Sequence, residues 1–244
     1  MRLAVISDIH GNLEAFREVL ADIDRSRMDE VLCLGDNVGY GPEPEAVVQL
    51  LRERQIPSVK GNHELGVTDP SYFHWFNSMA QASLRLTHRL LSETTLACLA
   101  DLPAYLILGE CLAVHGCPPD SPTRYLFELA DEELLILLKH LPQRLSFVGH
   151  THELELVSCD GLELSRRELG AGLVPLHPEH RFLINVGSVG QPRDGDPRAA
   201  YGIYKPEEGT FSLKRVPYDI RSTQGKIVAA GLPTFLAARL AEGR

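Results

Sequence analysis

The stretch "SFVGHTHELELV", residues 146–157, decides how the rest of the chain is interpreted. A run with strand propensity, residues 146–148, reaches Gly149, and His150 and His152 follow with one residue between them. Because alternate residues of an extended chain point to the same side, we expect the two imidazoles to share one space. Isolated histidines at such positions are more often core or surface residues than ligands, so the pair needs support from elsewhere in the chain.

The composition is that of a chain able to bury a sizeable core. It has 244 residues, of which 44% are hydrophobic, enough for one large domain or two small ones. The formal net charge of −9 argues against a surface that grips long nucleic acid or an anionic membrane. The first residues, "MRLAVISD", follow a buried-strand pattern instead of a signal peptide, and no apolar run reaches membrane-spanning length.

The cysteines are odd in number and form no CxxC pair, which argues against a disulfide framework and against a thiolate zinc site. They are Cys33, Cys98, Cys111, Cys117 and Cys159. We therefore expect reduced thiols and a cytoplasmic protein. The sequence leaves the oligomeric state open.

Short apolar runs alternate with helical patterns along the chain. Examples are "RLAVIS" before "NLEAFREVLADI", and "EVLCLG" before "EPEAVVQLLRER", with further strand-like runs at "IPSVKG", "CLAVHG" and "LSFVGH". This rhythm predicts an α/β fold with buried strands. Apolar residues at helical spacing predict helices over 75–92, from Phe76 to Leu91, and from residue 131 onward.

After residue 153 the pattern favours strands. An Asp160-Gly161 turn and the turn "PEEG" each separate two alternating runs, which predicts two hairpins. We find no repeat, low-complexity tract or linker. The simplest partition is one domain over 1–244 with a helical insertion at about 66–100.

Polar side chains follow five of the apolar runs, each beside a glycine, in "ISDIHGN", "LGDNVGYGP", "VKGNHE", "AVHGCP" and "VGHTHE". In open α/β sheets the carboxyl ends of the strands form the edge at which ligands bind. The residues gathered there are Asp8, His10, Asp36, Asn62, His63, His115, His150 and His152. Imidazole combined with carboxylate suits manganese, iron, zinc, cobalt or nickel, whereas an all-oxygen set suits magnesium or calcium.

This ordered set of motifs, DxH, GDxx, GNHE, HG and GHTH, resembles the calcineurin-like metallophosphoesterase superfamily. The stretches "FNSMAQASLRLTHRLLSETTLACLADLP" and "NVGSVGQPRDGDPRAAY" are similar to its bacterial and archaeal phosphodiesterase branch related to diadenosine tetraphosphatase. The resemblance covers nearly the whole chain. It implies an α/β fold, a four-layer α/β/β/α sandwich of two mixed sheets, with a dinuclear metal centre at the strand ends.

The resemblance also implies a role for each polar residue. Asp8, His10 and His152 would hold one metal, Asn62, His115 and His150 the second, and Asp36 would bridge the two. We expect manganese in the first place, with iron, zinc, cobalt or nickel as alternatives. Two metals roughly 3.5–4 Å apart can share a bridging hydroxide that attacks phosphorus. His63 would then be the general acid that protonates the leaving oxygen, with no covalent enzyme intermediate.

Three further residues have two interpretations each. Asn12 precedes a helical pattern and is either its N-cap or a substrate contact, and both roles are compatible. The resemblance places Arg193 beside the site, where its guanidinium could bind a substrate phosphate, although the surrounding loop could simply form turns. Cys117 is interpreted as a small packing residue in preference to a nucleophile.

The second motif indicates the substrate class. Protein phosphatases and symmetrical diadenosine tetraphosphatases of this superfamily carry an arginine shortly after the aspartate of that motif, whereas this chain reads "GDNVGYGP". We therefore expect hydrolysis of small phosphodiesters, with a nucleotide among the candidates. The alternatives are a dinucleoside polyphosphate hydrolase, a phosphomonoesterase or protein phosphatase, and, in a different class, a non-catalytic metal-binding scaffold.

Overall fold

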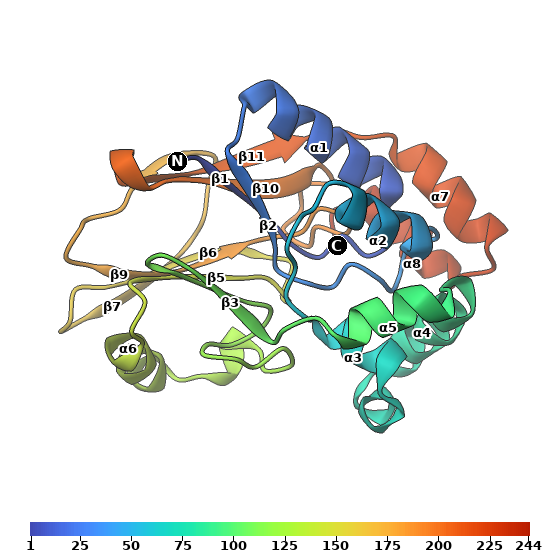
Figure 1. The fold of residues 1–244 in the computed structure, drawn as a ribbon, viewed down its shortest axis with the longest axis horizontal. Helices are drawn as coiled ribbons and strands as arrows, with labels where there is room; N and C mark the ends of the chain where they lie inside the picture. The colour runs from blue at the N-terminus through green and yellow to red at the C-terminus, as the bar shows by residue number, and fades with distance from the viewer.

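Two β-sheets stack face to face at the centre of the fold (Figure 1), in a computed structural model that describes residues 1–244. One sheet has five strands in the order β2-β1-β10-β11-β8. Its strands are β1 (Leu3–Ile6), β2 (Glu30–Cys33), β8 (Gly172–Pro175), β10 (Ala199–Lys205) and β11 (Thr210–Val216). The other has six strands in the order β3-β4-β5-β9-β6-β7. Its strands are β3 (Tyr105–Leu108), β4 (Cys111–Val114), β5 (Leu145–Val148), β6 (Leu154–Cys159), β7 (Leu164–Glu168) and β9 (Arg181–Val186).

Both sheets are mixed. In the first, β1 pairs in parallel with β2 and antiparallel with β10. In the second, β4, β5 and β9 are parallel neighbours, and β3 and β6 pair antiparallel at either side of them. Both predicted hairpins are confirmed, since β6 pairs with β7 and β10 with β11.

The main core lies between the sheets, and β1 shows why its sequence is apolar throughout. Leu3 and Val5 face the 21-residue cluster between the sheets, and Ala4 and Ile6 face a second cluster under the helices. A strand buried on both faces needs an uninterrupted apolar run, because successive side chains point to opposite faces.

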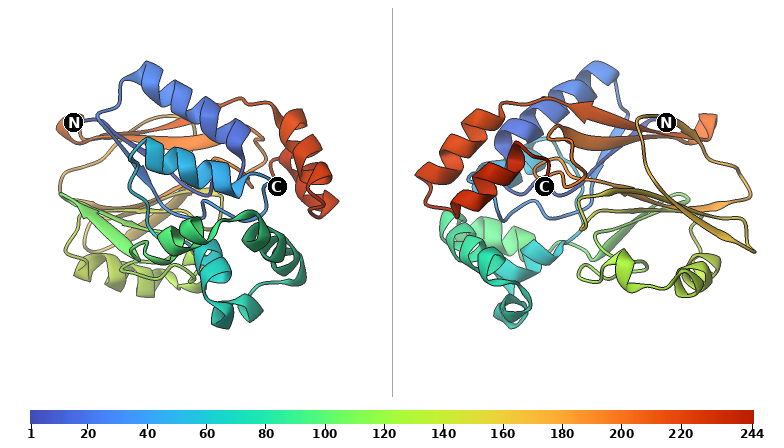
Figure 2. Two further views of the ribbon diagram at one scale, coloured as in Figure 1. Left: turned by 45° about the vertical axis from the view of Figure 1, so that its right-hand side comes forward. Right: turned by 180° about the vertical axis from the view of Figure 1, so that it is seen from behind.

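Helices cover the outer face of each sheet (Figure 2). Over the five-stranded sheet lie α1 (Leu13–Ser26) and α2 (Pro44–Glu53), with α7 (Ile220–Ala229) beside α1 and α8 (Thr234–Leu240) packed against α7. Over the six-stranded sheet lies α6 (Asp131–His140), which buries Leu134 and Leu138. The predicted fold, an α/β/β/α sandwich of two mixed sheets, is therefore confirmed.

Further helices connect the two halves between residues 62 and 100. They are α3 (Asn62–Thr68), the 3₁₀ helix η1 (Pro70–Trp75), α4 (Ser78–Leu90) and α5 (Glu93–Ala100). Two further 3₁₀ turns are η2 (Leu126–Glu128) and η3 (Pro206–Glu208). None of the helices combines the length and the apolar character needed to cross a membrane.

The predicted helix over 75–92 is too long at both ends. It begins at Ser78 because the Asn77 side chain accepts a hydrogen bond from the Ala80 N–H at 2.9 Å and caps it. Phe76 lies just outside the helix, although it packs against the same cluster. The expected strand at "IPSVKG" is also wrong, since only Ser58 forms a bridge there, with Cys33 of β2.

Candidate metal centre

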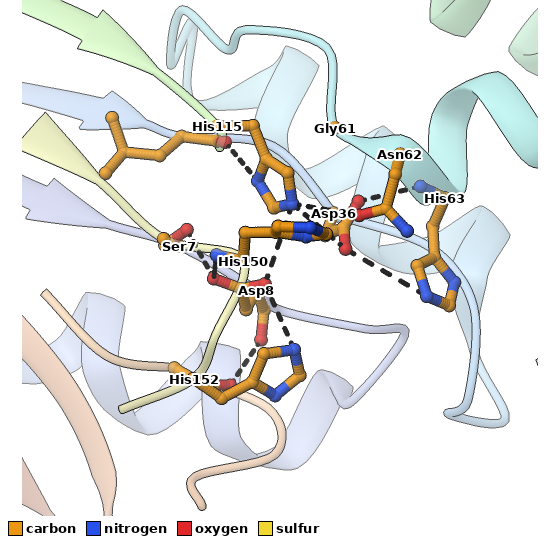
Figure 3. A network of polar contacts seen from close by, with 12 residues as sticks. Ser7, Asp8, Asp36, Gly61, Asn62, His63, His115, His150 and His152 are labelled. Atoms are coloured by element: carbon orange, nitrogen blue, oxygen red, sulfur yellow. Dashed lines mark hydrogen bonds and ion pairs between the residues drawn. The ribbon is translucent and has the colours of Figure 1, made fainter. Parts of the chain in front are cut away.

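The polar residues named from the sequence meet where the strands of both sheets end (Figure 3). Asp8 and Asp36 lie in the loops after β1 and β2 of the five-stranded sheet. His115, His150 and His152 lie after β4 and β5 of the six-stranded sheet. The site therefore lies at the junction of the two sheets and needs both of them.

One group contains Asp8, His10, Asp36 and His152, all buried, with their ligand atoms within 4.8 Å of one another. The Asp8 Oδ1 lies 3.2 Å from His152 Nε2 and 3.7 Å from His10 Nε2. His10 Nε2 also lies 3.7 Å from Asp36 Oδ2. Four donors thus face one small space.

A second group contains Asp36, His115 and His150, also buried. His115 Nε2 lies 3.2 Å from Asp36 Oδ2 and 3.1 Å from the amide oxygen of Asn62. Because Asp36 belongs to both groups, its carboxylate is the one that could bridge two ions. The structure thus brings together all seven residues that the sequence suggested as ligands.

The imidazoles are held in the way that suits metal ligands. Each turns one ring nitrogen toward the centre while the other contacts a backbone carbonyl, which fixes ring orientation and tautomer. These contacts are His10 Nδ1 to Val38 O at 3.0 Å, His115 Nδ1 to Leu34 O at 2.8 Å, His152 Nδ1 to Gln191 O at 2.7 Å, and His150 Nε2 to Thr123 O at 3.2 Å. In addition, the buried Asp8 Oδ1 has no hydrogen-bond partner. These donors fit divalent ions that accept nitrogen and oxygen ligands.

The carboxylates are ionised despite their burial. Burial alone would raise the pKa of Asp8 and Asp36, because it disfavours the charged form. The facing imidazoles outweigh this effect, His152 foremost at Asp8 and His115 foremost at Asp36, and hold both pKa values well below the ordinary value. Both side chains therefore present negative oxygens.

The imidazoles differ in charge. Burial, together with the charge of Arg193, lowers the pKa of His152 to about 3, and burial together with His115 lowers the pKa of His150 to about 4. Both rings are neutral at pH 7, as metal ligation requires. At His115 burial alone would lower the pKa, but Asp36 raises it to about 9, so an ion that binds there must displace a proton.

The backbone of the ligand loops is left-handed. Positive φ angles occur at Asp8 (53°), His10 (49°), Asp36 (52°), His150 (69°) and His152 (63°). The expectation that His150 and His152 project from an extended chain is therefore wrong, since β5 ends at Val148 and the two rings enter different groups. Residues of this kind cost of order 1–3 kcal/mol each and cluster at functional sites.

His63 lies at the margin of the cluster and is in neither group (Figure 3). Its Nε2 is 4.0 Å from Asp36 Oδ2, and its buried Nδ1 has no hydrogen-bond partner. The rings of Tyr40 and Phe76 pack against it at 4.4 and 5.2 Å between centroids. Unlike the four ligand candidates, His63 is fixed by ring packing and has no carbonyl to accept from it.

Glu64 has a role that the sequence did not reveal. Its buried carboxylate accepts hydrogen bonds from the backbone N–H groups of Gly61, Asp36 and Asn37, each at 2.8 Å. It thereby ties the loop after β2 to the start of α3. Burial, reinforced by Asp36, raises the pKa of Glu64 to about 7. The residue stands within "GNHE", but that motif does not show which backbone groups it binds.

The two residues expected to contact substrate have different surroundings in the structure. Asn12 caps α1 by accepting from the Ala15 N–H at 3.2 Å, and its amide donates to Gly190 O at 2.9 Å. Its polar atoms are therefore used within the protein. Arg193 instead lines a cavity beside the metal groups, and its buried Nε has no partner.

The surroundings of Cys117 do not suit a nucleophile. It is 1% exposed and packs in the cluster under α6. Burial raises the pKa of its thiol to about 11, which keeps it protonated at neutral pH. The packing interpretation from the sequence therefore agrees with its surroundings.

A cavity of about 680 Å³ opens beside the two groups. Its lining includes Asp36, Asn62, His63, His150 and His152 from the centre, and Arg193 and Tyr40 beside them. This volume falls in the range of small-molecule sites, roughly 300–1,000 Å³. The cluster is therefore accessible to a ligand with an organic part.

Comparison with known proteins identifies the family. The profile of the calcineurin-like phosphoesterase superfamily domain matches residues 1–209. An uncharacterized protein of Methanocaldococcus jannaschii is 36% identical over 247 residues, which cover 99% of this chain and 98% of that protein. This chain belongs to the calcineurin-like phosphoesterase superfamily, and the resemblance seen in its sequence is confirmed.

Solved structures agree in fold. A metallophosphoesterase from Sphaerobacter thermophilus has a TM-score of 0.86 and 36% identity, covering 100% of this chain and 99% of that one. A hypothetical protein from Pyrococcus horikoshii has a TM-score of 0.81 at 18% identity, covering 100% and 98%, which is a likeness of fold alone. The chain is thus a phosphoesterase of this superfamily with buried Asp and His groups suited to metal.

Proposed function

We propose that this protein is a dinuclear metal-dependent phosphoesterase that hydrolyses small phosphodiesters. The observation that carries the proposal is that two buried ligand groups share Asp36 and adjoin a cavity of about 680 Å³. Asp8, His10 and His152 would hold one ion, Asn62, His115 and His150 the other, and Asp36 both. Manganese is our first expectation, with iron, zinc, cobalt or nickel as alternatives. When bound, such a pair lowers the pKa of water and neutralises charge on a phosphate group.

His63 is proposed as the proton donor to the leaving oxygen. It lines the cavity, lies beside Asn62 in the chain and has an unused Nδ1. Burial lowers the pKa of His63, with Asp36 opposing, so the ring is neutral until an anion enters. An anionic ester in the cavity would favour the protonated imidazole and so prepare it to donate.

Arg193 is proposed to bind a non-bridging phosphate oxygen. Its guanidinium bonds to Gln191 Oε1 at 3.0 Å through Nη2, which leaves Nε to a ligand. The loop after Asp36 provides no second guanidinium, because "GDNVGYGP" contains no arginine. Asn37 instead points inward to Ser58 at 3.0 Å, and Val38 is buried. A diester carries one negative charge fewer than a dianionic monoester and depends less on extra cations.

The test is a comparison of kcat/KM at one Mn²⁺ concentration. The substrates are bis(p-nitrophenyl) phosphate, p-nitrophenyl phosphate, a phosphoserine peptide and diadenosine tetraphosphate. We expect the diester to be preferred. A clear preference for the phosphopeptide would refute the proposal, and a preference for diadenosine tetraphosphate would replace it with dinucleoside polyphosphate hydrolysis.

A simpler assay distinguishes the phosphoesterase from a non-catalytic scaffold. Protein stripped with a chelator should hydrolyse bis(p-nitrophenyl) phosphate only after Mn²⁺ is restored. Metal binding without turnover on any of the four substrates would favour the scaffold. The buried His63, which neither group uses, favours catalysis.

We propose the cytoplasm as the compartment. All five cysteines are free, and four of them are buried, which is typical of proteins in reducing compartments. The net charge of −9 favours small phosphate esters over long nucleic acid as partners, since no basic track would release counterions along a polymer. Fractionation of cells followed by immunodetection would test the compartment.

A further inference from the structure

We propose that the cavity beside the metal centre binds the base of a nucleoside phosphate ester, and that Trp75 stacks on that base. This inference rests on the proposed function, because the metal centre supplies the phosphate site. A methyl phosphate ester would leave most of the 680 Å³ unused. The size of the cavity therefore calls for a substrate with a large organic group.

One part of the cavity wall is aromatic. Tyr72, Trp75 and Phe76 line it from η1 and the residue that follows. Trp75 is 77% exposed, and it is the single tryptophan of the chain. A large ring that borders a cavity and is left uncovered is well suited to stack on a planar ligand.

The segment that carries Trp75 is held in place by the residues on either side of it. Phe76 packs edge-on against His63 at 5.2 Å, and a Cβ at Gly66 would come within 2.7 Å of the Phe76 ring. Phe73 lies under the Arg85 guanidinium at 5.0 Å. These contacts anchor η1 on both sides of Trp75, so a base would not have to order the segment.

The lining near Tyr125 offers a ligand no free ring face. The Tyr125 ring already stacks on His150 at 3.8 Å and on Phe127 at 4.7 Å. Asn77 and Glu128 also line the cavity and can bond to the donors and acceptors on the edge of a base. Among the rings that line the cavity, that of Trp75 is the most exposed and is the best placed to stack.

Two unpaired cations give the cavity affinity for anions beyond the metal site. Arg124 and Arg193 both line it, and neither forms an ion pair with a carboxylate of the protein. In a chain of net charge −9 such unpaired guanidinium groups at a cavity point to a phosphate-bearing ligand. A nucleoside phosphate ester satisfies both features of the cavity.

The first experiment measures binding without turnover. Mn²⁺-loaded protein is titrated with an adenosine phosphonate, whose P–C bond resists hydrolysis, and with the matching ribose phosphonate. We expect the adenosine compound alone to quench Trp75 fluorescence and to bind more tightly by roughly 5- to 150-fold, the usual effect of one stacked base. Equal affinities of the two compounds would overturn the proposal.

The second experiment assigns the effect to Trp75 by calorimetry. Trp75→Ala should remove the preference for the adenosine compound, Trp75→Phe should retain part of it, and Tyr105→Ala should leave it unchanged. Tyr105 is a matched control because it is exposed on β3 and does not line the cavity. A full preference in folded Trp75→Ala would refute stacking on Trp75.

The third experiment separates this inference from the proposed function. The nucleoside diester thymidine 5′-(p-nitrophenyl phosphate) and methyl p-nitrophenyl phosphate share a leaving group and a charge. Trp75→Ala should raise KM for the first by roughly 5- to 150-fold and leave kcat and the second substrate unchanged. If both diesters are hydrolysed with equal kcat/KM, the base site is refuted and the phosphoesterase activity is retained. If the nucleoside diester binds in a Trp75-dependent way but is not hydrolysed, the base site is supported and the proposed phosphoesterase activity is refuted.

Discussion

At the scale of single residues, Asp36 has the most demanding position. Its Oδ2 faces His115 and His10, and its Oδ1 accepts the backbone N–H of His63 at 2.8 Å. Its own N–H donates to Glu64. One carboxylate therefore serves both ligand groups and also fixes the start of the helix that carries His63.

The first prediction concerns this shared carboxylate. Asp36→Asn removes the charge that both groups need, so metal content should fall from about two ions per chain to below one, with loss of turnover. Elemental analysis checks the content, and His88→Ala, an exposed histidine outside both groups, serves as control. Two tightly bound ions and full activity in the Asp36 variant would show that the bridging assignment is wrong.

The second prediction concerns His63. His63→Ala should keep both ions and lose roughly 10²- to 10⁴-fold in kcat, the usual contribution of a positioned general acid. The loss should be smaller for a nitrophenyl ester than for an alkyl ester, since a good leaving group needs less protonation. Equal losses on the two esters with metals intact would exclude the donor role.

The sequence predicted which residues form the site but not the conformation of their backbone. The motifs predicted the polar side chains, because Asp, His and Asn beside glycine at strand ends are typical of ligand loops. The left-handed angles at His150 and His152 depend on contacts with other loops, such as the Asp8 carboxylate that accepts the His150 N–H at 3.1 Å. The role of Glu64 likewise depends on partners 27 and 28 residues away.

At the scale of elements, the loops after β1 and β5 hold the two sheets in register at the site. Gly149 follows β5, and a Cβ there would collide with the side chains of Ser7 and Asp8. The glycine is thus required by close approach of the two loops.

The third prediction uses this close approach. Gly149→Ala should push the Asp8 carboxylate out of its group and weaken binding of the first metal by about 10- to 100-fold, as loss of ligand orientation usually does. Calorimetric titration with Mn²⁺ measures the change. Gly170→Ala is the matched control, because nothing lies within 4 Å of a Cβ at that exposed glycine. Unchanged affinity in Gly149→Ala would mean that Asp8 is not a ligand.

Element prediction from the sequence succeeded for most strands, including β2 and β7 at sheet edges, and failed for β3, β8 and the central strand β9. β1, β4 and β5 are buried on both faces and read as apolar runs. β3 and β8 lie at sheet edges, with partly exposed residues and a proline at the end of β8, so their pattern alone did not identify them. Their pairing depends on the neighbouring strand.

At the scale of the whole molecule, the two ligand groups draw residues from both sheets. The 21-residue core between the sheets is apolar, so it supplies no charge to offset the clustered imidazoles and carboxylates. Bound ions would therefore stabilise the folded chain, because the unfolded chain offers no such site.

The fourth prediction follows from this linkage. Mn²⁺ at about 100 times its Kd should stabilise the protein by about 2.7 kcal/mol per site, which raises Tm by roughly 5–10 °C, and a chelator should reverse the shift. Differential scanning calorimetry checks this, with Ca²⁺ as a control that the imidazole-rich groups should bind poorly. No difference between Mn²⁺ and Ca²⁺ would contradict a specific centre.

Because the ligands run from Asp8 to His152 and come from both sheets, neither group is complete until the chain has been synthesised past that point and the sheets have docked. Uptake of metal therefore reports on the joined site. A chain with intact secondary structure but undocked sheets should bind neither ion, whereas a folded chain stripped by a chelator should take up metal again when Mn²⁺ is restored. Metal uptake can therefore serve as an assay of correct assembly during purification.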